Sequence, residues 1–316
     1  MPIPGANALV PGGGAAQQLA VRQSAVQLLD PPILSLSSVL LGRTLVLDDP
    51  LNGWTVQPGL AGMGVPPRTL WGDSAPLLDG ELTRGDRFDA RIVMIPLLLQ
   101  QPDPTSLRAA ERSLVDFLHA GDLALTATYR DGTARTTTGV RYAGGLEGAL
   151  TPDTYGPWFR RFVIEIRCPD PWFYDLTPST LTVVAGIATT FFPILPLVLA
   201  SGRTFGVVQV FNPGAVPSWP VWTITGPATT VTLSDGTNML TVTATLGAAA
   251  QIVVDTRRGQ ASVYDPATLT SQWPSIGDPS TFWPIRPGNS SLTITCTGST
   301  SATSIRLDFT PAYRTA

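Results

Sequence analysis

The chain lacks lysine altogether and has one histidine and two cysteines among its 316 residues, and only 14% of these residues are charged. So few histidines and cysteines argue against a structural zinc site, which needs several such ligands close together. The charged share lies well below the roughly 25% of an average globular domain. We therefore expect much of the surface to be covered in an assembly; an uncharged, Thr- and Ser-rich β-protein is the alternative.

A basic stripe is also lacking. The 20 basic residues are scattered arginines, of which only Arg160–Arg161 and Arg257–Arg258 are adjacent, and the formal net charge is −3. Proteins that follow a phosphate backbone carry clustered positive charge. Nucleic-acid binding is therefore not expected.

Long apolar runs are lacking as well. The longest, Phe191–Ala200, is too short to span a bilayer and is interrupted by Pro193 and Pro196. The first residues, MPIPGANALVPGGG, have no basic segment of the kind that opens a signal peptide. The sequence predicts no membrane anchor and no signal peptide, and residues 1–30 read as a loosely ordered arm.

The two cysteines, Cys168 and Cys296, are distant in sequence. A disulfide between them stays possible, but isolated cysteines are more often buried thiols. We expect buried thiols in a protein made in a reducing cytoplasm.

Glycine and proline, 30 of each, are abundant, and hydrophobic residues make up 43% of the chain. Together with many Thr, Val and Trp residues, they favour short strands joined by tight turns. The length suits two domains. We expect a boundary near residues 172–182, which gives a β-rich domain over 1–176 and a second domain over 177–316.

The first domain is predicted to hold one helix, over about 104–120. Asp103 is a suitable N-cap, Pro104 suits the first helical position, and Gly121 is a typical stop. One face of this helix is apolar at spacings of three and four residues: Leu107, Ala110, Leu114, Phe117 and Leu118. This helix should lie across a sheet.

Strands are predicted around this helix at Arg43–Asp48, Phe88–Leu99 and Trp158–Arg167, with a hairpin from Leu123 to Tyr142 that turns at Asp131-Gly132. Residues 58–76, rich in glycine and proline, are interpreted as a long loop. Their Gly59, Gly62 and Gly64 do not follow the dinucleotide-binding order. The segment CPDPWFYD at 168–175 should end the last strand and lead out of the domain.

The second domain shows no helical pattern, and short strands with regular turns predict an antiparallel β-sandwich. The expected strands are Leu181–Val184, Phe205–Asn212, Val221–Thr225, Thr230–Leu233, Leu240–Leu246, Gln251–Asp255, Leu292–Thr297 and Ser304–Pro311. The expected fold class is therefore mainly β, with one packed α-helix in the N-terminal domain.

Candidate catalytic residues do not form a recognisable set. His119 has no G-x-S-x-G nucleophile elbow to serve and stands near the end of the predicted helix, where it would interact with the helix dipole. Most aspartates stand beside Gly or Pro in turns. Glu165, in the middle of a strand, is expected to pair with an arginine on a neighbouring strand. We predict no enzyme activity and no catalytic, cofactor or metal site.

Aromatic residues of the second domain allow a different function. Trp219, Trp222, Trp273, Phe282 and Trp283 are rings of the kind that stack on sugars. A row of exposed rings would favour a carbohydrate-binding module. The preferred interpretation is structural, with Trp222 and Phe211 in the core and the rings of Trp219 and Trp283 packed on neighbouring prolines.

Several longer motifs resemble a known family. FNPGAVPSWPVWTITGP at 211–227, IVVDTRRG at 252–259, FWPIRPGNSSLTIT at 282–295 and RLDFTPAYRTA at 306–316 follow one another as in distal tail proteins of long-tailed phages of actinobacteria. The capped helix, the Asp-Gly hairpin, GGLEG at 144–148 and CPDPWFYD also occur in that family's order. The resemblance covers about residues 85–316 and is weak before them.

The resemblance implies a structural protein of the virion tail tip, a baseplate hub assembled in the host cytoplasm. Members form a ring, generally hexameric, in which the N-terminal domain continues the tail tube and a galectin-like C-terminal sandwich projects outward. The implied partners are the major tail tube protein, the tape-measure protein, the tail-associated hub protein and receptor-binding proteins. The alternative function is a baseplate-associated carbohydrate-binding module that recognises the host cell surface.

Overall fold

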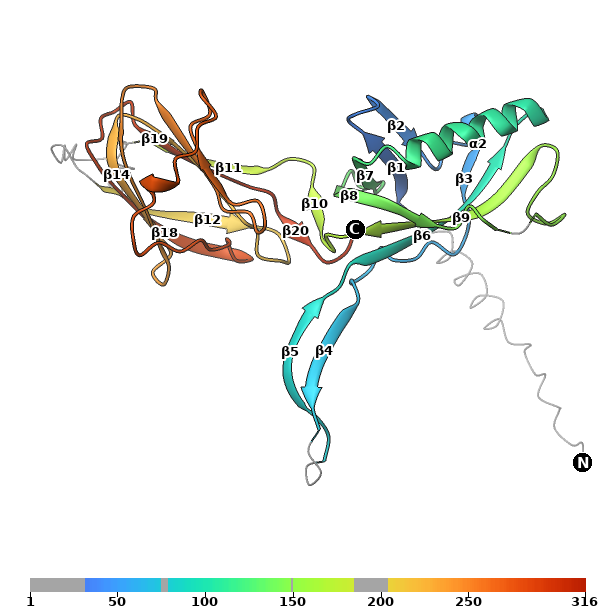
Figure 1. The fold of residues 1–316 in the computed structure, drawn as a ribbon, viewed down its shortest axis with the longest axis horizontal. Coiled ribbons are helices and arrows are strands. Elements are labelled where there is room, and N and C mark those ends of the chain that lie inside the picture. Colours follow the sequence, from blue (N-terminus) through green and yellow to red (C-terminus); the bar gives the residue numbers. More distant parts are fainter. Residues whose placement is uncertain (1–31, 75–78, 149, 185–203) are drawn as a thin grey trace, which may run out of the picture.

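A computed structural model describes residues 32–74, 79–148, 150–184 and 204–316. It contains two bodies of antiparallel strands and a hairpin that projects from the first body (Figure 1). The fold is mainly β, as predicted. The N-terminal arm expected over residues 1–30 and the apolar run Phe191–Ala200 lie outside the described residues.

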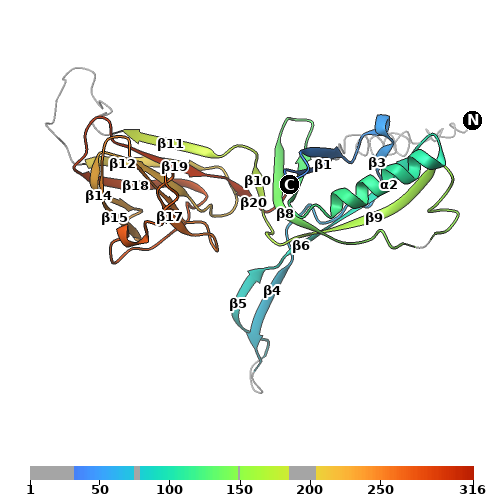
Figure 2. The same ribbon diagram turned by 45° about the horizontal axis from the view of Figure 1, so that its top comes forward.

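The first body is a nine-stranded sheet that packs against one helix (Figure 2). Across the main path, the strands are β2 (Arg43–Val46), β1 (Ile33–Ser38), β7 (Leu123–Thr128), β8 (Ala134–Gly144), β9 (Phe159–Cys168), β6 (Arg91–Gln100) and β3 (Trp54–Val56). Strand β10 (Phe173–Asp175) pairs with β8, and β20 (Ala312–Tyr313) pairs with β10. A short 3-10 turn, η1 (Pro50–Asn52), connects β2 to β3.

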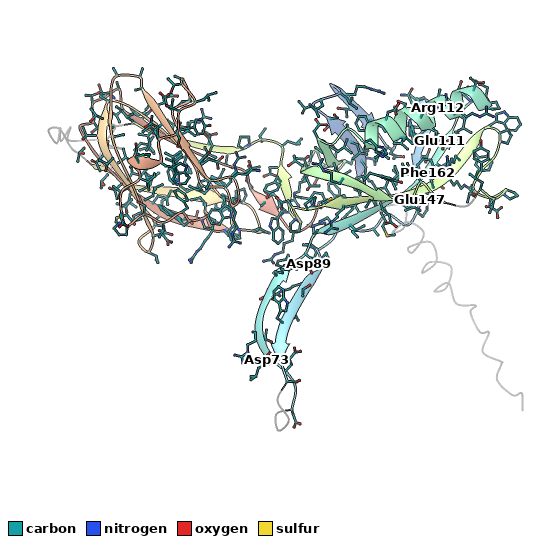
Figure 3. All side chains as sticks on the ribbon, in the orientation of Figure 1. Asp73, Asp89, Glu111, Arg112, Glu147 and Phe162 are labelled. Atoms are coloured by element: carbon teal, nitrogen blue, oxygen red, sulfur yellow. The ribbon has the colours of Figure 1, made fainter. Side chains whose placement is uncertain are left out.

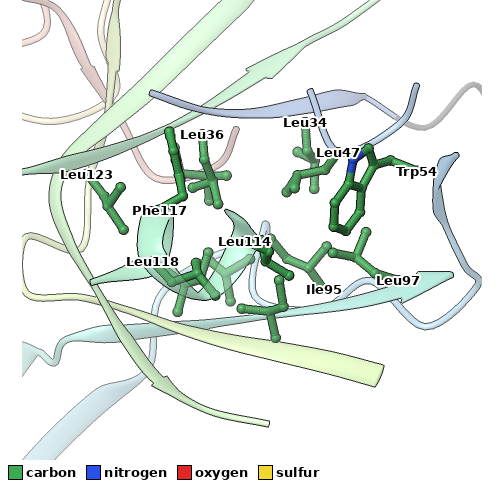
Figure 4. Close-up of a cluster of buried hydrophobic side chains, with 14 of the residues drawn as sticks. Leu34, Leu36, Leu47, Trp54, Ile95, Leu97, Leu114, Phe117, Leu118 and Leu123 are labelled. Atoms are coloured by element: carbon green, nitrogen blue, oxygen red, sulfur yellow. The ribbon is translucent and has the colours of Figure 1, made fainter. Parts of the chain in front are cut away.

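The predicted helix is α2 (Pro104–Leu118). Its first turn is fixed because the Asp103 carboxylate accepts hydrogen bonds from the backbone N–H groups of Thr105 (2.8 Å) and Ser106 (3.0 Å). The helix ends at His119, and Gly121 follows with a φ of 82°. Its apolar face meets β1, β3 and β6 in the core, where Leu114 and Phe117 face Leu34, Leu36, Ile95 and Leu97 (Figure 4).

Strands β9 and β6 lie side by side in this sheet, with β6 next to the edge strand β3, and both alternate between buried and exposed residues. Val93, Ile95, Leu97 and Leu99 are buried from β6, and Phe162, Ile164 and Ile166 are buried from β9. The predicted strand Phe88–Leu99 is wrong at its start, because Phe88 ends another strand and β6 begins at Arg91. Its apolar end is not buried on both faces, since Leu98 is only half-buried between two buried leucines.

The interpretation of residues 58–76 as a loop is wrong for its second half. Strand β4 (Arg68–Asp73) pairs with β5 (Leu82–Phe88) in a two-stranded hairpin that runs from the pair Arg68–Phe88 to the pair Asp73–Leu82, with a register shift between Trp71 and Gly72. Neither strand contributes to a core, so neither shows the alternation of apolar and polar residues that reveals a half-buried strand. Strands β1 and β3 were also not predicted.

The second body is the predicted antiparallel sandwich. One sheet has the order β11 (Ser179–Val184), β19 (Ser304–Phe309), β13 (Val221–Thr225), β16 (Gln251–Asp255) and β17 (Ser262–Tyr264). The other has the order β12 (Thr204–Asn212), β18 (Gly288–Thr297), β14 (Ala228–Ser234) and β15 (Met239–Leu246). All eight predicted strands are present; β17, β20 and a 3-10 turn, η2 (Trp273–Ser275), were not predicted.

A buried arginine lies where the two bodies meet. Arg91 is 1% exposed, and its five N–H groups all donate to backbone carbonyl oxygens. Nε and Nη2 bind Pro171 O (3.0 and 2.6 Å), Nη1 binds Gly62 O and Gly64 O (both 2.7 Å), and Nη2 also binds Arg314 O (2.7 Å). One side chain therefore fastens three segments that are distant in sequence.

Within the described part of the chain, no carboxylate accepts a hydrogen bond from Arg91. The guanidinium carbon lies 4.4 Å from the centre of the Phe173 ring, a cation–π contact. Burial lowers the pKa of Arg91 from its ordinary value, and the nearby Cys168 and Asp170 oppose this shift. An arginine keeps its proton under such conditions, so the carbonyl dipoles and the ring stabilise a buried charge.

The last residues leave the sandwich and return to the first body, so that the C-terminus lies at the junction of the two bodies (Figures 1 and 2). After β20, Arg135 Nη1 donates to Thr315 O and Tyr129 Oη donates to Ala316 O, each at 3.0 Å. The prediction that CPDPWFYD leads out of the first domain is wrong in part, because β10 within it still pairs with β8 and β20.

The motif FNPGAVPSW forms a turn of the sandwich that also contacts the returning end of the chain at this junction. The buried Asn212 accepts from Gly214 N (2.9 Å) and donates to Ile285 O (3.0 Å), which fixes a turn at the end of β12. Ala215 N then donates to Ala312 O at 2.8 Å. A Cβ on Gly214 would lie 2.7 Å from that same carbonyl oxygen, so only glycine allows the approach.

Replacing Arg91 with Met should lower the free energy of unfolding by about 3 kcal/mol or more, because hydrogen bonds from a charged group contribute about 1.5–3 kcal/mol each and the carbonyls would be left buried without donors. Urea unfolding followed by tryptophan fluorescence measures this. The exposed Arg112→Met serves as the control and should unfold like the wild type. Equal midpoints for both variants would contradict this role of Arg91.

Both cysteine thiols are free and buried, Cys168 in the first core and Cys296 in the second. Burial raises the pKa of Cys168 to about 11 and raises that of Cys296 as well. An aromatic disulfide reagent at pH 8 should therefore find no reactive thiol in the folded protein and two after unfolding. Rapid reaction of the native protein would show that a core opens.

The same burial gives a pH dependence. The unfolded chain releases the Cys168 proton near the ordinary thiol pKa of 9.0, whereas the folded protein holds it to about 11. Stability should therefore fall as the pH rises through this interval. Urea midpoints of wild type and Cys168→Ala across that range measure the effect, and the variant should show a smaller decline. Parallel declines would assign the loss to other groups.

Candidate assembly surfaces

The residues that the sequence offered as candidates for catalysis or metal binding lie apart from one another in the structure. His119 is the C-cap residue that follows α2, and its Nδ1 lies 2.8 Å from Val115 O in the last turn of the helix. Glu111 forms an ion pair with Arg160, which joins the helix to β9. Among the described residues, no three His, Cys, Asp or Glu side chains form a cluster that could hold a metal ion. No helix in the described ranges is long and apolar enough to cross a membrane.

The expected arginine partner of Glu165 is wrong. The register places Glu165 opposite Met94 of β6 on one side and Gly144 of β8 on the other. A register shift between Tyr142 and Gly144 sets this pairing. A sequence without known strand pairing gives no means of predicting it, because a shift of one residue changes every cross-strand neighbour.

The aromatic residues of the sandwich do not form one exposed row. Trp222 and Trp283 are buried in its core, Trp219 is half-buried, and Trp273 is exposed with its ring centre 5.9 Å from that of Phe282. The prediction for Trp222 is confirmed. The prediction that Phe211 is a core residue is wrong, because its side chain lies on the outer face of β12 and is 61% exposed.

The hairpin β4–β5 is the most exposed part of the described structure that keeps regular strands. It extends away from the sheet, with Asp73 near its tip and Asp89 at its base (Figure 3). Charged pairs bridge its strands: Arg84 with Asp73 at 2.6 Å, and Arg68 with Asp86. Leu70, Trp71 and Leu82 are also exposed and belong to neither core. The hairpin thus offers apolar and charged side chains to solvent together.

The base of the hairpin is held firmly. The Phe88 ring meets the Trp172 ring edge-on, with centres 4.9 Å apart, and the Arg68 guanidinium lies 5.4 Å from the Phe88 ring centre. Asp89 accepts a hydrogen bond from Thr69, which holds the pKa of this exposed carboxyl below its ordinary value. The direction of the hairpin is therefore set by contacts with the first body.

The loop before the hairpin is fitted to the same body. Ala61 exchanges two backbone hydrogen bonds with Met94, at 3.1 and 3.0 Å, and so continues the sheet beyond β3. Gly62 has a φ of 88°, and a Cβ there would collide with the carbonyl oxygen of Ile92. Close backbone packing therefore requires glycine at position 62, and the carbonyl oxygens of Gly62 and Gly64 accept hydrogen bonds from Arg91.

Among the described residues of its strands, the outer face of the four-stranded sheet carries no charged side chain. In register across it lie hydroxyl, amide and apolar side chains from four strands: Val207, Gln209 and Phe211; Asn289, Ser291, Thr293, Thr295 and Thr297; Thr230, Thr232 and Ser234; Met239, Thr241 and Thr243. Many are exposed. This neutral face accounts for part of the low charge of the chain and is a second candidate surface for another protein.

Comparison with known proteins points to one family. Residues 213–313 match the family of siphovirus-type tail components, C-terminal domain. The matched range covers the turn at Asn212–Gly214 in part, most of the sandwich and β20, which are the features that build the junction between the two bodies. No curated protein matches the chain.

Among solved structures, the Dit protein of phage SPP1, described as a paradigm of the hub adsorption apparatus in phages that infect Gram-positive bacteria, has a TM-score of 0.63 at 18% identity. The match covers 89% of this chain and 99% of that one, so both bodies share its fold. A chain of the phage P2 baseplate, in its activated conformation with Ca, has a TM-score of 0.47 at 8% identity. That match covers 88% of this chain and 97% of the baseplate chain. Residues 213–313 thus match the C-terminal domain of siphovirus-type tail components, and the chain shares its fold with SPP1 Dit, in agreement with the predicted resemblance to phage distal tail proteins.

Proposed function

We propose that the chain is a distal tail protein that forms a ring, with six copies, at the end of a siphovirus tail tube and acts as the hub of the baseplate. The tail-component family of residues 213–313 supports a place in the virion tail. The fold shared with SPP1 Dit supports the hub role. The observation that carries ring formation is the projecting hairpin β4–β5.

An isolated two-stranded hairpin is marginally stable in water unless a further surface covers it. Here Leu70, Trp71 and Leu82 are 64%, 45% and 51% exposed, although strand pairing and the Phe88–Trp172 contact hold the hairpin in one direction. A second copy of the chain can cover these residues. Contact between an arm of one subunit and the body of the next is heterologous, and such contacts generate a closed ring when the rotation closes.

The two bodies then have different roles. Residues 1–176 form the ring and continue the tail tube, and residues 177–316 project outward as a galectin-like sandwich. Arg91 and the returning segment at 311–316 support a fixed direction of projection. The neutral outer face of the sandwich is available to partner proteins.

The proposed partners are the major tail tube protein, the tape-measure protein, the tail-associated hub protein and receptor-binding proteins at the virion tail tip. Assembly takes place in the host cytoplasm. The role is structural: the chain places other proteins and is not an enzyme.

Ring formation is tested by the mass of the purified full chain over a wide concentration range, with negative-stain images of the same samples. We expect a discrete species of six chains with a central channel. A chain that remains a monomer at every concentration would contradict closure of a ring by this protein alone.

Replacing residues 70–85 with a short Gly/Ser linker should leave the melting temperature nearly unchanged, because no hairpin residue belongs to either core. The same variant should lose the ring or weaken it strongly. The exposed Leu269→Ser in the sandwich is the matched control and should keep the ring. A hairpin variant that still forms six-membered rings at wild-type concentrations would remove the hairpin from the interface.

A further inference from the structure

Two exposed apolar clusters lie at opposite ends of helix α2. The first is the turn between β1 and β2, with Val39, Leu40 and Leu41 exposed by 90%, 77% and 43%; we name it the apolar turn. It lies next to the C-terminal end of the helix, because Leu40 N donates to Oδ2 of Asp122, which comes shortly after α2, at 2.7 Å. Ser38 Oγ donates to the other oxygen of that carboxylate at 2.5 Å.

These bonds make the apolar turn a rigid feature. The Ser38 hydroxyl and the Leu40 backbone hold the pKa of Asp122 below its ordinary value, so the carboxylate stays charged and keeps both donors. Three successive apolar side chains at a fixed turn tip are unusual on a monomer's surface, where apolar residues are normally exposed singly.

The second cluster consists of Leu51 and Trp158, exposed by 98% and 60%; we name it the Leu51–Trp158 patch. Gln101, three residues before α2, ties the two segments together. Its backbone N–H donates to Trp158 O at 2.9 Å, and its Nε2 donates to Asn52 O at 3.0 Å. The patch therefore lies at the start of the helix.

The length of α2 separates the two clusters. Fifteen residues at about 1.5 Å each give a helix of about 22 Å, so the clusters of one subunit cannot cover each other. A heterologous contact needs two different surfaces on opposite sides of a subunit, which is the arrangement found here.

The charges beside the clusters are complementary. At the apolar turn, the Asp122 carboxylate is already bound by Ser38 and Leu40, and the exposed Arg43 follows the turn. Asp49 and Asp103 flank the Leu51–Trp158 patch. Hydrogen bonds from Ser106 hold the pKa of Asp103 below its ordinary value, so it remains an anion. Complementary charge at the rim favours a head-to-tail encounter of two copies over a turn-to-turn encounter.

We propose that the apolar turn of one subunit packs against the Leu51–Trp158 patch of the next, and that this contact closes the ring. The inference rests on the proposed ring and names two of its contacting surfaces. A tryptophan beside leucines suits the centre of such an interface, because large rings contribute much of the binding energy there.

The test uses two full-length variants, Val39→Asp with Leu40→Asp and Leu51→Asp with Trp158→Ser. Each alone should be a monomer, a sixfold fall in mass, because each lacks one side of this contact and the hairpin contact by itself does not hold two chains together. An equimolar mixture should give a heterodimer and nothing larger, since one intact turn meets one intact patch. Unchanged melting temperatures show that both variants fold, and the exposed Leu269→Asp is the control that should keep the ring.

The other outcomes overturn specific parts. A Leu51/Trp158 variant that dimerises by itself would show a turn-to-turn contact and overturn the head-to-tail pairing. Two variants that both keep wild-type rings would overturn the assigned surfaces while the ring itself stands. A wild-type chain that stays monomeric would overturn the ring and this contact with it.

Discussion

The arrangement of this protein depends on one buried cation. Arg91 is the first residue of strand β6. All of its side-chain N–H groups donate to carbonyl oxygens of the loop before the hairpin, the turn after β9 and the end of the chain. The Arg91 side chain has all of its hydrogen-bond acceptors only when these three segments are in place. The hairpin, the sheet and the sandwich are therefore positioned together, and none of the three can shift without uncovering a charge.

The distribution of charge follows from the same arrangement. Charged pairs gather on the hairpin, where Arg68, Asp73, Arg84 and Asp86 bridge two exposed strands. The outer face of the four-stranded sheet has only hydroxyl, amide and apolar side chains. A low overall charge thus reflects a molecule with distinct neutral and charged surfaces, which suits a protein that contacts several different neighbours rather than one that stays alone in solution.

Only part of these surfaces was accessible to prediction. The order of the glycines at 59, 62 and 64 argues against a nucleotide-binding motif. The close packing of Gly62 against β6, and the hydrogen bonds that the Gly62 and Gly64 carbonyl oxygens accept from Arg91, depend on partners 27 residues or more away in sequence. The hairpin could not be predicted from periodicity, because both faces of its strands are exposed to water. The apolar turn and the Leu51–Trp158 patch could not be predicted, because the exposure of an apolar side chain depends on which residues pack against it in the fold.

The sequence by itself determined the elements whose signal is local. Asp103, Pro104 and Gly121 defined the helix, Asp131-Gly132 defined a turn, and alternation defined β9, because capping, positive φ and periodic burial are properties of a few neighbouring residues. Only the tertiary structure decided the partners of Glu165, the exposure of Phe211 and the return of β20 to the first sheet. These depend on strand register and on contacts between distant segments, which local patterns do not encode.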